Sequence, residues 1–166
     1  MSFYGTVAKA DTYHADRGNT AWDASGVSTP DKEQALLRAS EYIDYHFRSS
    51  FPGYKTGLRT QTREWPRAWA FDIEHNSIDD DEVPIEVERA TYEAALRELA
   101  TPGSLLPDVT PRDQVKREKV GPIEVEYNTP PTAGASMPIL TIVRGILAPI
   151  LTGPAVSSVV GKAVRG

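Results

Sequence analysis

The sequence predicts a mainly α fold, a small helical bundle that carries a two-stranded β-ribbon and an extended C-terminal arm. Two long segments repeat apolar residues at helical spacing, and one short segment alternates apolar and charged residues. A Pro-containing stretch then precedes the most apolar run of the chain. We therefore expect a helical body over residues 1–128, with the ribbon near 114–127, followed by a linker and docking arm over 129–166.

Helix signals begin in the first fifty residues. Asp11 is a candidate N-cap for a short helix over 12–17, and Gly18 is the kind of residue that ends one. A longer helix is predicted over 30–48, with Thr29 as its N-cap and a proline in the first turn. The residues of its expected buried stripe are Leu36, Ala39, Ser40, Ile43 and Phe47.

Residues 54–81 show neither helical nor strand periodicity and are expected to form an ordered loop, anchored on the helices by Trp22, Trp65 and Trp69. A further helix is predicted from Pro84 to about residue 100. Because it carries two apolar stripes, we expect neighbours on both sides and a central place in the fold. The two stripes are Ile85, Tyr92, Leu96 and Leu99, and Val87, Ala90, Thr91 and Ala94.

Residues 115–127 alternate around Gly121 and Pro122, which predicts the two strands of the ribbon. The expected apolar face consists of Ile123, Val125 and Tyr127. A two-stranded ribbon is only marginally stable by itself in water. The ribbon therefore needs a surface of the body or of another subunit.

Residues 129–135 are expected to form a linker, and the apolar run follows it. The run contains Arg144 and Pro149 and is too short to span a bilayer, so we expect no membrane association. A segment that docks on another chain is the favoured interpretation. Its candidate docking residues are Ile139, Leu140, Ile142, Val143, Ile146, Leu147, Ile150 and Leu151.

Charge is distributed unevenly along the chain of 166 residues, which has 23 acidic and 18 basic side chains and a net charge of −5. Residues 129–166 carry +3 and no acid, which leaves −8 for residues 1–128. Within the body, residues 55–67 carry +3, whereas residues 72–88 hold eight acids and no base. We expect these two stretches to form a solvated pair of loops that attract each other.

The sequence contains no catalytic constellation, so we expect neither enzymatic activity nor a cofactor or metal. The absence of Cys excludes disulfides, thiolate metal sites and Cys nucleophiles. The three His residues stand far apart. Gly161-Lys162 does not complete a phosphate loop, because Val156 and Ala163 stand where Gly and Ser or Thr are required. No secretory pattern follows Met1, so we expect synthesis in a cytoplasm.

Aromatic and basic side chains interleave in one segment, which is a pattern typical of proteins that hold single-stranded nucleic acid. The candidate patch consists of Lys55, Arg59, Arg63, Trp65, Arg67 and Trp69. The acidic charge of the body opposes phosphate binding. The same aromatic residues could instead serve as core or subunit contacts, and the residue pattern leaves both interpretations open.

A family resemblance rests on stretches that occur in a fixed order. They include Phe51-Pro52-Gly53, Pro102-Gly103-Ser104-Leu105 and residues 119–127, together with residues 11–19, 37–44, 61–67 and 83–95. Together, over about residues 10–151, they resemble a bacteriophage family of DnaT-like single-stranded-DNA-binding proteins. They are also similar to the head-to-tail adaptor, or connector, proteins of long-tailed phages.

The adaptor resemblance implies a structural virion protein of the neck region. Copies would form a homo-oligomeric ring, expected to be a dodecamer, between the portal protein and a tail-side connector or tail terminator. Genomic dsDNA would pass through the channel without specific binding, since an acidic wall does not hold phosphates. The alternative is a single-stranded-DNA-binding protein of phage replication that uses the candidate patch. The resemblance gives no counterpart for residues 152–166, so no role is expected for them from it.

Overall fold

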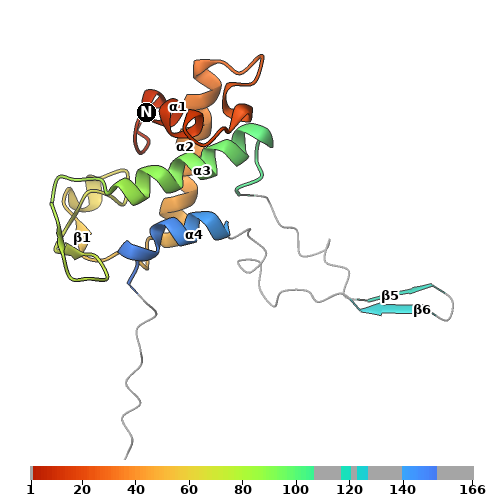
Figure 1. The fold of residues 1–166 in the computed structure, drawn as a ribbon. Helices are drawn as coiled ribbons and strands as arrows, with labels where there is room; N and C mark the ends of the chain where they lie inside the picture. The colour runs from red at the N-terminus through yellow and green to blue at the C-terminus, as the bar shows by residue number, and fades with distance from the viewer. Residues whose placement is uncertain (1, 107–116, 121–122, 127–139, 153–166) are drawn as a thin grey trace, which may run out of the picture.

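The computed structural model describes residues 2–106, 117–120, 123–126 and 140–152 (Figure 1). It confirms the mainly α fold. The elements in chain order are α1 (Val7–Ala15), the 3-10 helix η1 (Thr20–Asp23), α2 (Thr29–Phe47), β1 (Tyr54–Lys55), the 3-10 helix η2 (Leu58–Thr60), β2 (Arg67–Ala68), β3 (Ala70–Phe71), β4 (Ser77–Ile78), α3 (Ile85–Ala100), β5 (Arg117–Val120), β6 (Ile123–Glu126), α4 (Thr141–Leu147) and the 3-10 helix η5 (Ala148–Ile150).

The first helix begins earlier than the sequence predicts. Thr6 is its N-cap, because the Thr6 hydroxyl accepts a hydrogen bond from the Lys9 backbone N–H at 3.2 Å. Asp11 therefore lies inside α1 instead of capping it. Its carboxylate accepts hydrogen bonds from the Trp22 indole at 2.7 Å and from Lys32 Nζ at 2.8 Å, which ties α1 to η1 and α2.

Helix α2 begins with a capping box. The Ser28 hydroxyl accepts a bond from the Asp31 N–H at 3.4 Å, and the Asp31 carboxylate accepts one from the Ser28 N–H at 2.9 Å. The N-cap is thus Ser28 and not Thr29, whereas the helix itself is confirmed. Every residue of its predicted stripe is buried.

Helix α3 is central, as its two apolar stripes predict. It packs against α2, α4 and α1, and Figure 1 shows it passing between α1 and α4. Val87, Ala90 and Ala94 are fully buried. The other stripe is only partly covered, since Ile85 at the start of the helix is 51% exposed.

The apolar run near the C-terminus packs on its own chain, which corrects the docking prediction. Leu140, Val143, Leu147 and Ile150 belong to the same hydrophobic core as α2 and α3. The prediction that these four side chains dock on another chain is wrong, because α4 packs against α3 of the same body and the four side chains are buried in its core.

The remaining docking candidates differ in their surroundings. Ile142 is 43% exposed, while Ile146 and Leu151 are partly buried against the core. Ile139 lies outside the described residues, as do the predicted linker over 129–135 and the tail over 153–166.

Three hydrogen bonds fasten the end of this segment to the body. The Ile73 N–H donates to the Pro149 carbonyl at 2.8 Å. The Thr152 N–H and hydroxyl donate to the Ser50 carbonyl at 2.7 and 2.8 Å. The described chain therefore ends beside the turn that follows α2.

Residues 54–78 contain strands that the sequence did not predict. β1 pairs antiparallel with β2, with Tyr54 opposite Ala68, and β3 pairs antiparallel with β4. The turn before β1 requires glycine, since Gly53 has φ 65° and an added Cβ would lie 2.1 Å from the Ala68 carbonyl oxygen.

The predicted ribbon is confirmed as an antiparallel pair. β5 and β6 pair with Arg117 opposite Glu126 and Val120 opposite Ile123. This register pairs the end of β5 with the start of β6. Gly121, Pro122 and Tyr127 lie outside the described residues, so the predicted apolar face stays a prediction.

Candidate nucleic-acid interface

The six residues of the predicted patch do not lie on one surface. Arg63, Trp65 and Arg67 are only 7%, 2% and 7% exposed. Arg59 and Trp69 are exposed, and Lys55 is half-buried. The prediction of a nucleic-acid patch is therefore wrong for Arg63, Trp65 and Arg67. The contacts that these three side chains make instead hold the loop against the body.

Arg67 fastens the turn after α2 to β2. Its Nε donates to the Pro52 carbonyl at 2.6 Å, and its Nη2 donates to the Gly53 carbonyl at 2.8 Å. Its Nη1 forms an ion pair with the Glu64 carboxylate at 3.0 Å. A guanidinium offers several donors in one plane and can satisfy these acceptors together. Arg67 is thus a structural cross-link.

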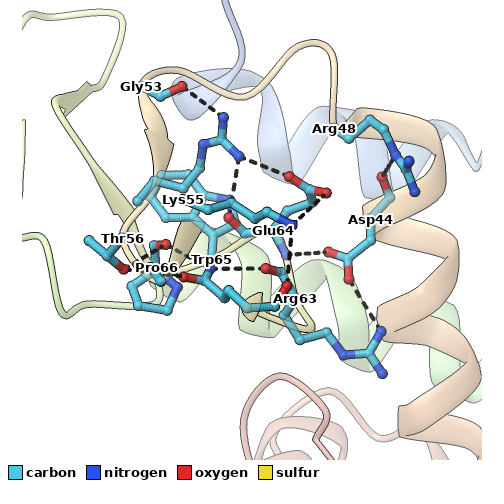
Figure 2. A network of polar contacts seen from close by, with 12 residues as sticks. Asp44, Arg48, Gly53, Lys55, Thr56, Arg63, Glu64, Trp65 and Pro66 are labelled. Carbon is cyan, nitrogen blue, oxygen red and sulfur yellow. Dashed lines mark hydrogen bonds and ion pairs between the residues drawn. The ribbon is translucent and has the colours of Figure 1, made fainter. Parts of the chain in front are cut away.

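Arg63 links the loop to α2 and to the start of the chain. Its Nη1 lies 3.2 Å from Asp44 Oδ2, and Figure 2 shows the Arg63 side chain reaching toward the Asp44 carboxylate on α2. Its Nε donates to the Ser2 carbonyl at 2.7 Å. Both charged groups are nearly buried, so each depends on the other for compensation.

Asp44 is the centre of a buried polar network. Besides the Arg63 pair, its carboxylate accepts hydrogen bonds from the Tyr4 hydroxyl and from the Glu64 N–H. The Tyr4 hydroxyl in turn accepts a bond from the Trp65 N–H at 3.2 Å. Burial raises the pKa of the Asp44 carboxyl, although the bonds from Tyr4 and Arg63 act in the opposite direction.

Sequence reasoning did not predict this role for Asp44, although a signal was present. Ser40, Asp44 and Phe47 follow one another on the buried side of α2. An acid in the middle of an apolar stripe requires a cation or several donors from elsewhere in the chain. The identity of those donors, Tyr4 and Arg63, could not be read from spacing.

The three Trp residues divide into anchors and one exposed ring. Trp65 is 2% exposed, which confirms its predicted anchoring role. Trp22 is 0% exposed, but it contacts Asp11, His14 and Lys32, so it fastens η1 to α1 and α2 and not the loop over 54–81. The Trp65 ring packs edge-on against Phe51, with ring centroids 5.6 Å apart. Trp69 is 71% exposed, so the prediction that it also anchors the loop is wrong.

An exposed aromatic surface remains, which we define as Tyr54, Trp69 and Phe71. These side chains are 52%, 71% and 44% exposed. Trp69 connects β2 to β3 and has φ 57°, a left-handed conformation that L-residues with side chains seldom adopt. Backbone strain that presents a large ring to solvent is typical of functional positions.

Two cations accompany the aromatic surface. Arg59 lies on η2 and is exposed. Lys55 neighbours Tyr54 on β1, and its Nζ donates to the Gln61 carbonyl at 3.2 Å and lies 3.9 Å from the Glu64 carboxylate. Within the described structure, Arg59 therefore forms no ion pair, whereas Lys55 is partly neutralised by Glu64.

The structure does not show the predicted pairing of the basic stretch over residues 55–67 with the acidic stretch over residues 72–88. Three of the four cations of residues 55–67, Lys55, Arg63 and Arg67, pair with Asp44, Glu64 and, at 4.0 Å, Glu41. In the described part of the chain, no acid between residues 72 and 82 takes part in an ion pair. These acids, mostly exposed, border the aromatic surface at β3 and β4.

The described residues contain no group of three or more His, Asp or Glu side chains that could hold a metal ion. His14 is fully buried on α1, and burial lowers its pKa. Among the described helices, none is both long and apolar enough to cross a membrane.

Comparison with known proteins identifies one matching protein family. Neither the curated proteins nor the solved structures include a match to the chain. One family model matches residues 2–166, and its description is "Putative DnaT-like ssDNA binding protein". The match includes residues 152–166, so the expectation that these residues have no counterpart in the family is wrong. Because this match spans nearly the whole sequence, the chain belongs to that DnaT-like family.

Proposed function

We propose that this protein binds single-stranded DNA through the aromatic surface, without catalysing a reaction on it. The observation that carries the proposal is Trp69, a ring 71% exposed on a left-handed backbone between two short sheets. The description of the family supports the same activity. The site is Tyr54, Trp69 and Phe71, with Lys55 and Arg59 beside them.

Stacking is the main source of affinity at this site. Each base stacked on an aromatic side chain contributes about 1–3 kcal/mol, and every base has a face that can stack. Only Lys55 and Arg59 of the predicted cations are accessible, so phosphate contacts add little. We therefore expect weak sequence preference and modest affinity.

The first test removes the exposed ring. Trp69→Ala should weaken binding to an oligo-dT strand by about 5- to 150-fold, which corresponds to the loss of one stacked base. Fluorescence anisotropy of a labelled oligonucleotide measures this change. Trp69→Phe should retain most of the affinity, because it keeps an aromatic face.

A matched control distinguishes stacking from general surface damage. Tyr45 lies on α2, outside the aromatic surface, and is 58% exposed. Tyr45→Ala should bind like the unchanged protein. Equal affinities for the Trp69→Ala and Tyr45→Ala proteins, or no binding by the unchanged protein, contradict the proposal.

A second function, the head-to-tail adaptor of a phage virion, is favoured by a different observation. Leu58 and Ile73, in the same segment as the aromatic surface, are 69% and 64% exposed. Large apolar side chains that are this exposed are candidates for protein contacts. In this role the region would join copies of the chain in a ring beneath the portal protein.

The adaptor proposal is tested by imaging purified virions and by measuring the mass of the isolated protein. The chain should occupy the vertex between capsid and tail, and Leu58→Asp with Ile73→Asp should prevent its incorporation. A variant that enters particles normally contradicts the role of this region in assembly. Oligonucleotide binding in the same variant tells the two functions apart.

A further inference from the structure

The described chain ends close to the aromatic surface. Thr152 is held by two hydrogen bonds to the Ser50 carbonyl, three residues before Gly53. At Gly53 an added Cβ would lie 2.9 Å from the Trp69 carbonyl carbon, so this turn runs directly against the Trp69 backbone. The Pro149 carbonyl is also bonded to the Ile73 N–H at 2.8 Å. Residues 153–166 therefore continue from a point beside Trp69 and Ile73.

The surface at this point is apolar and acidic. Trp69, Phe71 and Ile73 are 71%, 44% and 64% exposed. Glu74 and the acidic run over residues 79–82 are exposed around them and form no ion pair within the described structure. A ligand for this surface should combine apolar side chains with positive charge.

Residues 153–166 combine apolar side chains with positive charge. They contain four Val residues together with Lys162 and Arg165, and no acid. Fourteen residues reach up to about 50 Å when extended, so length does not limit contact with a surface that begins beside Thr152. A tethered segment is also present at millimolar effective concentration, which allows weak contacts to be populated.

We propose that residues 153–166 bind back onto the surface formed by Trp69, Phe71 and Ile73, with Lys162 and Arg165 facing the acidic run over residues 79–82. The occupant of this surface in the free protein is thus the C-terminal segment of the same chain. Because this contact covers Trp69, the segment competes with any other ligand of the aromatic surface.

Trp fluorescence tests the proposal directly. Trp22 and Trp65 are buried in the body, so only Trp69 responds to a change at the surface. In the full-length Lys162→Glu/Arg165→Glu protein we expect the emission to shift to the red and the acrylamide quenching constant to rise. A chain that ends at Thr152 should show the same two changes.

Two controls make the readout specific. Arg144→Glu reverses an exposed charge on α4 and should leave both quantities unchanged. Trp69→Phe should abolish the response to the charge reversal, because it removes the reporting ring. Raising the salt concentration should move the unchanged protein towards the quenching of the charge-reversed one.

Two results overturn the inference. One is equal quenching in the full-length, charge-reversed and shortened proteins at low salt. The other is a quenching constant that changes with protein concentration, which would identify a second copy as the occupant. Since no nucleic acid is present in these measurements, their failure is separate from failure of DNA binding. With oligo-dT added, the shortened protein should bind more tightly than the full chain.

Discussion

At the scale of single residues, similar side chains in one segment have opposite roles. Arg63 and Arg67 are buried cross-links, whereas Arg59, on the same loop, is exposed. Trp65 anchors the loop, whereas Trp69 faces solvent. The difference arises from acceptors elsewhere in the fold, above all the Asp44 carboxylate and the Pro52 and Gly53 carbonyls.

The Arg63–Asp44 pair is expected to be important for stability. Arg63→Ala leaves the Asp44 carboxylate buried without its cation, which should lower the free energy of unfolding by about 3–5 kcal/mol. Urea denaturation followed by circular dichroism measures the change. Arg59→Ala, an exposed control, should change stability by less than about 0.5 kcal/mol. Similar midpoints for both variants would refute the structural role of Arg63.

His14 makes stability depend on pH. Burial lowers the pKa of His14, so the folded protein keeps its imidazole neutral while the unfolded chain gains a proton near pH 6.5. The folded state then binds fewer protons, and the free energy of unfolding falls as pH drops below about 6.5, by at most about 1.4 kcal/mol per pH unit.

Denaturation curves between pH 7.5 and pH 5.5 measure this dependence. His14→Phe should flatten the slope, even if it lowers stability at every pH. Ile142→Ala changes an exposed side chain that has no titratable group and should leave the slope unchanged. A slope that His14→Phe does not affect would assign the pH dependence to other groups.

At the scale of elements, α4 completes the body. Its position depends on α3, which offers an apolar face on each side, and on the Tyr42 hydroxyl, which accepts a hydrogen bond from the Leu140 N–H at 3.1 Å. The apolar residues over 139–151 recur in pairs at helical spacing. This spacing could not indicate whether the surface that covers them belongs to this chain or to another.

Leu147→Ala tests this packing in the isolated protein. Leu147 is fully buried, so its truncation should lower the free energy of unfolding by about 2–5 kcal/mol. Ile142→Ala, on the exposed side of the same helix, should cost much less. Thermal denaturation compares the two. Unchanged stability of the Leu147→Ala protein would show that α4 does not pack on its own body in solution.

At the scale of the whole molecule, charge limits how nucleic acid can bind. The chain carries a net charge of −5, and two of the four cations of the predicted patch, Arg63 and Arg67, are buried. Long-range attraction of phosphates is therefore weak, and stacking must provide most of the affinity. This balance distinguishes the proposed site from a basic groove.

Salt dependence measures that balance. Replacing Lys55 and Arg59 together by Gln should reduce the slope of log affinity against log salt by about 1.4, from about 0.7 per phosphate contact on a single strand. Titrations of oligo-dT between low and moderate salt give the slope. Lys9→Gln, an exposed cation on α1, is the control and should not alter it. An unchanged slope in the double variant would remove Lys55 and Arg59 from the interface.

Local sequence patterns were sufficient to predict most of the helices and the β-ribbon of this protein. Helical periodicity placed α2 and α3 to within a residue or two, alternation placed the ribbon, and the family resemblance was present in the order of short stretches. The predicted start of the first helix was several residues too late, because Thr6 and Asp11 are both residue types that can cap a helix. The contacts of the Asp11 carboxylate with Trp22 and Lys32 distinguish the two, and these contacts are not visible in the sequence.

Contacts between residues far apart in the chain determined the features that local sequence patterns did not predict. Which arginines are buried, which Trp is exposed and where the apolar C-terminal run packs all depend on residues far apart in the chain, such as Arg63 with Asp44 and Leu140 with Tyr42. Periodicity reports only which side of an element is apolar. Burial is a property of the surfaces that meet, so it follows from the assembled fold and not from the order of the residues.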